Sequence, residues 1–329
     1  MIMYSSRRHF LKTGLATGAT LSLLPQLLLS CQSNQGSKSA GDTSAAPADT
    51  SKKYFDHIGV QLYTLRDAFD ADPEGTLKNI AEVGYKEVEL HNVNLLTDYA
   101  SVCKEVGLAV TSSHFSSAYI TGQWEILEAF GASRPEDTRF ASILAVAAKH
   151  ELPYLVMPML FPQERGDLDR YKQLAAIFNQ RGEECKQAGV KFCYHNHSFE
   201  FEPMGGQTPF EVLMTETDPE LVDFELDIFW VKASGNDPVA FMKKYPDRIK
   251  LLHLKDLKPG ISPSFKTMEM GMQHPDAFME VGAGSIDFTA VLTTAAGIGV
   301  TNCYVEQDQS PDPLASIATS YRNLSEIGL

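Results

Sequence analysis

The chain has 329 residues and a formal net charge of −14, which becomes −17 once the three basic residues among positions 1–30 are set aside. This negative balance repels phosphate backbones, so we expect no nucleic-acid partner. Residues 54–329 are enough for one large α/β domain and somewhat short for two.

The first 31 residues predict an export signal. Residues 6–12 (SRRHFLK) precede an apolar stretch from Leu15 to Leu29, which is too short for a membrane span and typical of a twin-arginine signal. Residues 28–31 (LLSC) resemble the lipobox of bacterial lipoproteins, in which Cys31 would carry the lipid; the alternative is a cleaved signal with Cys31 merely nearby. We therefore expect a periplasmic lipoprotein that is exported by the twin-arginine machinery and held at the membrane by its lipid anchor only.

Residues 32–53 predict a disordered linker, because they are rich in Ser, Ala, Gly and Thr and lack apolar periodicity. The remaining four cysteines show no C-x-x-C spacing and fall within helix or strand patterns. We expect them to be buried free thiols, although export leaves a disulfide open. They are Cys103, Cys185, Cys193 and Cys303.

Eight apolar runs of strand length follow, and most precede a stretch with helical periodicity. The runs start near Ile58, Tyr85, Ala109, Tyr154, Lys191, Leu221, Ile249 and Asn302. Helices are expected over 76–83, 96–106, 138–149, 168–188, 209–217, 238–245, 288–296 and 314–327, and glycines stand where several should end. This alternation predicts a (β/α)8 TIM barrel over 54–329. A doubly wound open sheet is the lesser alternative, since no G-x-G-x-x-G turn follows the first strand.

Two connections are long, 115–139 after the third strand and 258–287 after the seventh. In a barrel, both would lie at the carboxyl face of the strands, where βα loops build active sites.

Metal-ligating residues recur at the ends of the later strands. His195, Asp227, His253 and Glu306 each close an apolar run, and strand alternation lets each face the barrel interior. His197 shares the parity of His195, so either histidine could be the fifth-strand ligand. Taken singly, a histidine here could simply be hydrogen-bonded and Asp227 could cap the next helix, but four such residues favour one divalent-metal site. The mixed nitrogen and oxygen set suits Mn²⁺ or Co²⁺ best, with Mg²⁺ or Zn²⁺ as alternatives.

Other polar residues at the same face are expected to contact substrate. Glu89 and His114 end the second and third strands, and Gln61 is a weaker candidate on the first. Lys255 is a further candidate, with a simple pairing to Asp256 at the rim as its alternative. Glu306 and His197 are the candidate general bases, whereas Glu200 and Glu202 are expected in a solvated loop.

Several motifs, in this order and spacing, resemble the xylose isomerase-like TIM-barrel family, which is usually labelled sugar phosphate isomerase/epimerase and includes the AP endonuclease family 2-like proteins. They are IGVQLYTLR (58–66), GYKEVEL (84–90), YHNH (194–197), LDIFW (226–230), HLKD (253–256), VGAGSIDF (281–288) and YVEQ (304–307). The resemblance implies a metal held by Asp227, His253, Glu306 and a fifth-strand residue. His195 stands where many members have a glutamate that also serves ketose epimerases as acid/base. Trp230 likewise stands where those epimerases have a histidine.

The resemblance implies a divalent-metal-dependent carbohydrate isomerase or epimerase, which removes a proton next to a carbonyl and passes through an enediolate. Elimination is the alternative, as in a 3-keto-glycoside lyase or a dehydratase. An exported protein favours a free or oxidised sugar as its small carbohydrate substrate over a phosphorylated one. A non-catalytic, carbohydrate-binding periplasmic lipoprotein is the alternative from another class.

Overall fold

The computed structural model describes residues 58–300 and 302–327. The predicted twin-arginine signal, the lipobox with Cys31 and the linker 32–53 lie outside this part of the chain. Within it, no helix combines the length and the apolar character that a membrane crossing requires.

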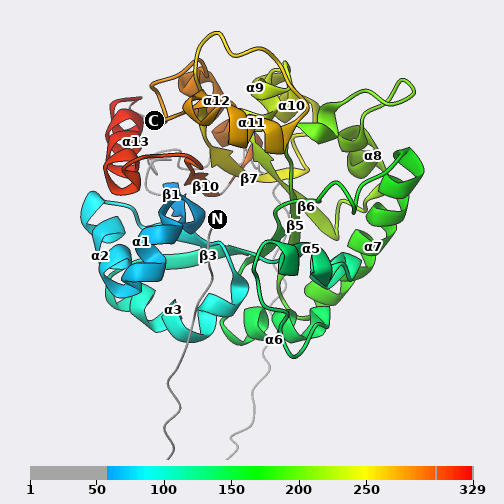
Figure 1. Ribbon diagram of the computed structural model, residues 1–329, viewed down its shortest axis with the longest axis horizontal. Helices are drawn as coiled ribbons and strands as arrows, with labels where there is room; N and C mark the ends of the chain where they lie inside the picture. Colours follow the sequence, from blue (N-terminus) through cyan, green and yellow to red (C-terminus); the bar gives the residue numbers. More distant parts are fainter. Residues whose placement is uncertain (1–57, 301, 328–329) are drawn as a thin grey trace, which may run out of the picture. The chain divides into compact units, whose positions relative to one another are not determined.

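Eight parallel strands close into a barrel in the order β1-β10-β7-β6-β5-β4-β3-β2, which confirms the predicted TIM barrel (Figure 1). Each strand starts within two residues of its predicted position. The barrel strands are β1 (Ile58–Gln61), β2 (Glu87–Leu90), β3 (Ala109–His114), β4 (Tyr154–Met157), β5 (Lys191–His195), β6 (Val222–Asp227), β7 (Ile249–Leu254) and β10 (Asn302–Val305).

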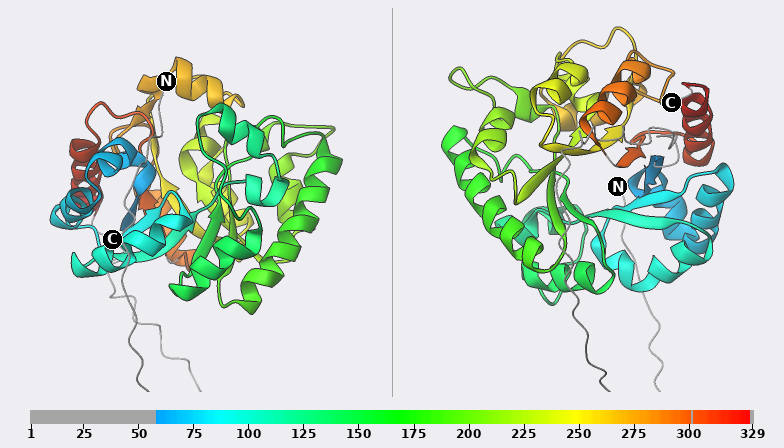
Figure 2. Two further views of the ribbon diagram at one scale, coloured as in Figure 1. Left: turned by 60° about the horizontal axis from the view of Figure 1, so that its bottom comes forward. Right: turned by 180° about the vertical axis from the view of Figure 1, so that it is seen from behind.

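Helices surround the barrel on its outside (Figure 2). They are α1 (Arg66–Ala71), α2 (Pro73–Val83), α3 (Leu96–Glu105), α4 (Ala118–Thr121), α5 (Trp124–Ala129), α6 (Phe140–Lys149), α7 (Leu168–Gln187), α8 (Pro209–Glu216), α9 (Ile228–Ala233), α10 (Pro238–Lys244), α11 (Thr267–Gln273), α12 (Phe288–Ile298) and α13 (Pro313–Ile327). Every predicted helix is present, within two residues at each end apart from the start of α2. The short helices α1, α4, α5, α9 and α11 were not predicted.

Local sequence fixes the helix ends. The Asp167 carboxylate accepts the backbone N–H of Arg170 and caps α7, and Thr208 with Glu211 forms a reciprocal capping box at the start of α8. Gly299 ends helix α12. It adopts a left-handed conformation with φ of 77°, which a residue with a Cβ atom rarely adopts.

The long connection after β7 is anchored by the buried carboxylate of Asp256. Asp256 and Leu257 form the short strand β8, which pairs antiparallel with β9 (Phe278–Met279). The carboxylate accepts backbone N–H groups of Leu257, Gly282, Gly284 and Ile286 at 2.8–3.1 Å. Because both Asp256 oxygens are used in this way, the predicted alternative that Asp256 pairs with Lys255 is wrong.

Beneath the carboxyl face, the interior of the barrel contains an apolar layer. Val156, Cys193, Leu251 and Tyr304 form a buried cluster of their own there, one or more layers below the strand ends. Cys103, Cys185, Cys193 and Cys303 are all buried thiols, as predicted. This apolar layer lies beneath the polar residues of the carboxyl face, while Glu87, Thr111 and Asn302 form a separate polar group.

Candidate metal centre

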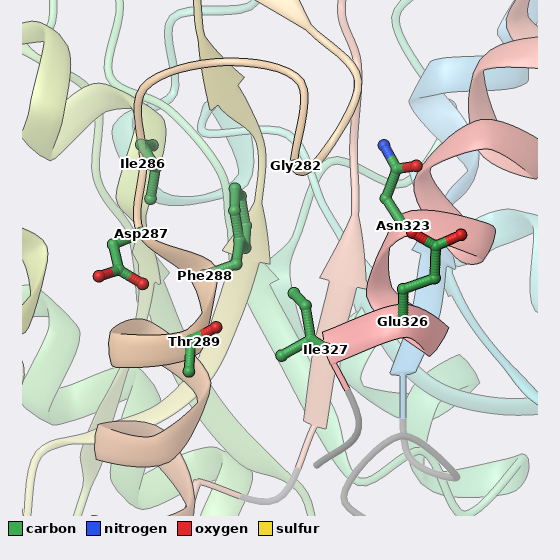
Figure 3. Close-up of a pocket in the computed structure, with 8 residues that line it drawn as sticks. All are labelled: Gly282, Ile286, Asp287, Phe288, Thr289, Asn323, Glu326 and Ile327. Carbon is green, nitrogen blue, oxygen red and sulfur yellow. The ribbon is translucent and has the colours of Figure 1, made fainter.

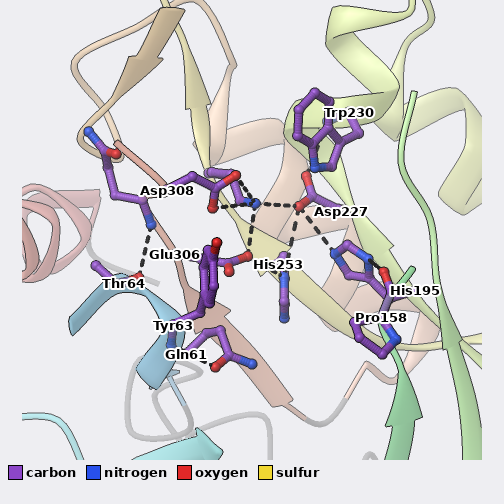
Figure 4. A network of polar contacts seen from close by, with 12 residues as sticks. Gln61, Tyr63, Thr64, Pro158, His195, Asp227, Trp230, His253, Glu306 and Asp308 are labelled. Atoms are coloured by element: carbon purple, nitrogen blue, oxygen red, sulfur yellow. Dashed lines mark hydrogen bonds and ion pairs between the residues drawn. The ribbon is translucent and has the colours of Figure 1, made fainter. Parts of the chain in front are cut away.

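The four predicted metal ligands meet at the carboxyl ends of the strands. His195 and Asp227 are the last residues of β5 and β6, Asp227 lies level with His253 of β7, and Glu306 follows β10. One donor atom from each lies within 4.8 Å of the others, and all four residues are buried. We call these four residues the outer cluster (Figure 4).

Asp227 shows how the chain leaves one carboxylate oxygen for this cluster. Its Oδ1 accepts the backbone N–H of Trp230 at 3.1 Å and caps α9, as the sequence allowed. The Asn196 side chain exchanges two hydrogen bonds with the Asp227 backbone and so ties the ends of β5 and β6 together. Oδ2 therefore faces the interior, next to His195.

The histidines of the outer cluster each have one nitrogen available for a metal. His195 Nδ1 lies 2.9 Å from the Pro158 carbonyl, which can only accept, so Nδ1 carries the proton and Nε2 turns its lone pair toward Asp227 Oδ2 at 3.3 Å. His253 Nδ1 lies 2.8 Å from Glu306 Oε2, yet it makes no hydrogen bond with any described residue. A lone pair facing a carboxylate oxygen is repulsive unless a metal ion or a proton lies between them, so this donor set fits a divalent metal.

Lys255 is the buried cation of the site. It is 2% exposed, and its Nζ lies 2.8 Å from Glu306 Oε2, 3.1 Å from Asp227 Oδ2 and 3.1 Å from Asp308 Oδ1. Burial opposes its charge, but the three carboxylates raise the pKa of Lys255 well above its usual value. Lys255, a predicted substrate contact, thus lies within hydrogen-bond reach of two ligand carboxylates.

Both ligand carboxylates are held in the ionised form. Burial alone would raise the pKa of Asp227, but the Lys255 ammonium overcomes it and holds that pKa well below the usual range. In the same way, Lys255 and His253 outweigh burial and lower the pKa of Glu306. Charged carboxylates are the form that binds a metal.

A second buried group, the inner cluster, lies next to the outer one and shares His253 with it. It consists of Glu89, His114, Glu225 and His253. Glu89 Oε2 lies 2.7 Å from His253 Nε2 and 3.0 Å from His114 Nε2. Against the effect of burial, Glu89 and Glu225 raise the pKa of His114 to about 9.

Gln61 also belongs to this inner region. Its Nε2 donates to Glu89 Oε2 at 2.5 Å, and its Oε1 accepts the backbone N–H of Tyr63. Gln61 and Glu89 are completely buried, whereas His114 is 7% exposed. Of the four predicted substrate contacts, only His114 therefore has more than a trace of exposed surface.

His197, the other candidate base, lies beside the outer cluster and contributes to neither cluster. Its ring stacks near Phe199 and Trp230 and lies 4.9 Å from the His195 ring. Its buried Nδ1 has no hydrogen-bond partner among the described residues. Burial, reinforced by His195 and Lys255, lowers the pKa of His197 well below the usual value and keeps the ring neutral.

Glu200 lies behind His197, so its predicted place in a solvated loop is wrong. The 3₁₀ turn Phe199–Phe201 buries it completely, because its two phenylalanine neighbours enter the core. Its carboxylate accepts the Tyr194 hydroxyl at 2.5 Å and the backbone N–H of His197 at 2.8 Å. Glu202 is exposed, as expected.

Two carboxylates of the site, Glu225 and Asp308, were not predicted from the sequence to be site residues. Glu225 shares the parity of Asp227 and lies one layer deeper, so alternation could have identified it. Asp308 follows the end of β10, where side chains no longer alternate, and only the structure shows it against Lys255.

A surface pocket of about 500 Å³ lies elsewhere, between the start of α12 and the end of α13 (Figure 3). It is lined by Gly282, Ile286, Asp287, Phe288, Thr289, Asn323, Glu326 and Ile327. It includes none of the strand-end residues, so we assign it no part in the metal centre.

Known proteins share this architecture. The sequence pattern of the family described as "Xylose isomerase-like TIM barrel" matches residues 77–325, which confirms the predicted resemblance. Among solved structures, the chain is similar to a sugar phosphate isomerase/epimerase from Parabacteroides distasonis, with 26% identity and a TM-score of 0.66 over 82% of this chain and 97% of that one.

The curated relatives described next are named inosose dehydratases rather than isomerases or epimerases. The chain is 29% identical to the inosose dehydratase of a Clostridium botulinum strain over 235 residues, which cover 68% of this chain and 77% of that protein. It is 32% identical to the inosose dehydratase of Clostridium tetani over 173 residues, or 51% of this chain. That second match spans only 55% of the relative's length.

Proposed function

We propose a function for this chain on the premise that it belongs to the xylose isomerase-like TIM-barrel family. The protein is a divalent-metal-dependent enzyme that removes a proton from the carbon next to a carbonyl group of a small carbohydrate. The observation that carries this proposal is the outer cluster, in which two histidine nitrogens and two ionised carboxylates face one another in a buried site.

His195, Asp227, His253 and Glu306 would hold the metal. When bound, the ion supplies Lewis-acid stabilisation to negative charge that develops on the substrate oxygens. Mn²⁺ or Co²⁺ suits this donor set best, with Mg²⁺ or Zn²⁺ as alternatives.

The protein's own residues supply the proton transfer. His197 is neutral and has a free Nδ1, so it accepts the proton from carbon. Glu306 is the alternative base; the surroundings of both groups disfavour protonation, but the Glu306 carboxylate is also engaged by Lys255 and His253. Lys255 keeps Asp227 and Glu306 ionised while the proton moves, and burial of the site excludes water.

Elimination of water is the outcome that the curated relatives favour, since they are named inosose dehydratases. Isomerisation or epimerisation is the second candidate, favoured by the name of the Parabacteroides distasonis structure. The residue His195 favours elimination over epimerisation. The resemblance places the acid/base glutamate of the epimerases at this position, and this chain has a histidine there instead.

The test is a set of incubations in D₂O with Mn²⁺ or Co²⁺. Deuterium entering the carbon next to the carbonyl of an inosose, a free ketose or a 3-keto-glycoside reports proton removal itself. Loss of water then identifies a dehydratase, release of an aglycone a lyase, and a new ketose an isomerase or epimerase. The His253→Ala variant should lose both the metal and the exchange; retention of both would rule out the site assignment. Tight sugar binding without metal or exchange would favour a carbohydrate-binding protein.

Export and lipidation extend this proposal. The signal and lipobox pattern of residues 1–31 support a periplasmic lipoprotein, and therefore a substrate without phosphate. Fractionation tests it: the Cys31→Ser variant should leave the membrane fraction for the soluble periplasm, and equal membrane association of both proteins would argue against the lipid anchor.

A further inference from the structure

The Nε2 side of His253 shows an arrangement that the proposed function does not use. His253 spans the two clusters: Nδ1 faces Glu306, whereas Nε2 lies 2.7 Å from Glu89 Oε2. A carboxylate oxygen can only accept, so this contact places a proton on Nε2. In a metal-bound imidazole, the other nitrogen keeps its proton, and Nδ1 is then the nitrogen with a free lone pair.

Several hydrogen bonds hold the Glu89 carboxylate in its position next to His253 Nε2. Its Oε2 receives Gln61 Nε2 at 2.5 Å and His114 Nε2 at 3.0 Å, and its Oε1 receives the Ser112 hydroxyl at 2.5 Å. Four side-chain donors, His253 included, thus converge on a carboxylate with no exposed surface. Such saturation with hydrogen bonds leaves Glu89 no free direction and stabilises its charge.

We infer that Glu89 is a positioning residue that fixes the His253 tautomer and ring orientation, so that Nδ1 is presented to the metal in the outer cluster. The inference rests on the proposed metal site. Glu89 was predicted from the sequence to contact substrate, but its complete burial suits a support of the ligand instead. Carboxylates that accept the second N–H of a ligand histidine typically contribute 10–100-fold to metal affinity.

The alternative is that the inner cluster binds a second metal ion. Glu225 Oε1 is buried without a hydrogen-bond partner in the described structure, and Glu225 Oε2 lies 3.2 Å from His253 Nε2. Two ions would then have to share one imidazole, one at each nitrogen, which requires a doubly deprotonated ring. The Glu89–His253 hydrogen bond favours the single-ion arrangement.

The experiment compares metal binding by the full-length wild type and the isosteric Glu89→Gln variant. Co²⁺ is titrated into each metal-free protein, followed by its visible absorption and by competition with a chelator. We expect one ion per chain in both proteins, a 10–100-fold weaker affinity in the variant, and a changed Co²⁺ spectrum. Glu87→Gln is the matched control: Glu87 lies on the same strand and bonds Thr111 and Asn302, and this variant should bind like the wild type.

Each other outcome has a distinct meaning. A wild type that binds no Co²⁺ contradicts the proposed metal site. A wild type that binds one ion, with a Glu89→Gln variant of equal affinity and spectrum, overturns only the inference. Two ions in the wild type, one of them lost in the variant, overturn it in favour of a second cation site. If Glu89→Gln does not unfold cooperatively, Glu89→Asp replaces it, since it keeps the charge, withdraws the carboxylate from His253 and should weaken binding in the same way.

Discussion

Glu200 is buried next to the proposed base, and it should make stability depend on pH. Burial raises its pKa to about 7 from an unfolded value of 4.5, although its bonds to Tyr194 and His197 oppose the shift. The folded protein therefore keeps a proton that the unfolded chain loses, and stability falls as the pH rises from 4.5 to 7. The shift corresponds to about 3 kcal/mol.

The Glu200→Gln variant should lack this contribution. Relative to the wild type, its free energy of unfolding should increase by about 3 kcal/mol between pH 4.5 and pH 8, as measured by urea unfolding. Glu202→Gln, an equal change at an exposed position nearby, should follow the wild-type profile. Parallel profiles for all three proteins would show that Glu200 ionises normally.

Single residues were predictable where the strand pattern governs them. His195, Asp227 and Glu306 could be placed because strand ends and alternation fix where they point. Glu200 was misplaced because its burial depends on a short turn that has no period of its own. The phenylalanines on either side of it were the available signal.

At the scale of elements, the packing of α7 against the segment before β6 depends on one glycine. Gly182 lies within α7, and a Cβ atom added there would come within 2.3 Å of the Leu221 carbonyl oxygen. Alanine favours a helix over glycine by about 1 kcal/mol, but overpacking against backbone costs about 1–3 kcal/mol. The clash should outweigh the propensity.

We therefore expect Gly182→Ala to destabilise the protein by up to about 2 kcal/mol, as measured by the midpoint of urea unfolding at constant m. Gly271→Ala in α11 is the matched control, because an added Cβ meets no atom within 4 Å there. The control should be neutral or gain up to about 1 kcal/mol. Equal effects of both substitutions would mean that α7 can shift away from β6 at little cost.

As with single residues, the elements that follow a periodic pattern were predictable from the sequence and the others were not. Long helices such as α7 repeat an apolar face over several turns, so periodicity identified them. The short elements β8, β9 and α11 have too few residues for a period. Their place depends on Asp256, whose four backbone contacts gather segments that lie far apart in the sequence.

For the whole molecule, closure of the barrel concentrates negative charge that a cation should offset. Asp227, Glu306 and Asp308 surround Lys255, while Glu89 and Glu225 lie one step away across His253. Eight βα units predict the closed barrel, but the sequence could not show how many of these carboxylates meet. Their number depends on the register between strands from opposite sides of the barrel.

Removal of the metal should therefore lower the thermal stability of the whole domain. An ion present at a thousandfold excess over its dissociation constant stabilises the fold by about 4 kcal/mol, or roughly 10 °C in Tm for a domain of this size. Against burial, Glu225 and Glu306 raise the pKa of His253 well above its usual value in the metal-free protein. A proton then takes part of the cation's place, and this substitute is lost as the pH rises. Differential scanning calorimetry with and without a chelator should thus show a larger loss of Tm at pH 8 than at pH 5.5. An unchanged Tm at both pH values would show that the buried carboxylates are balanced by the protein alone.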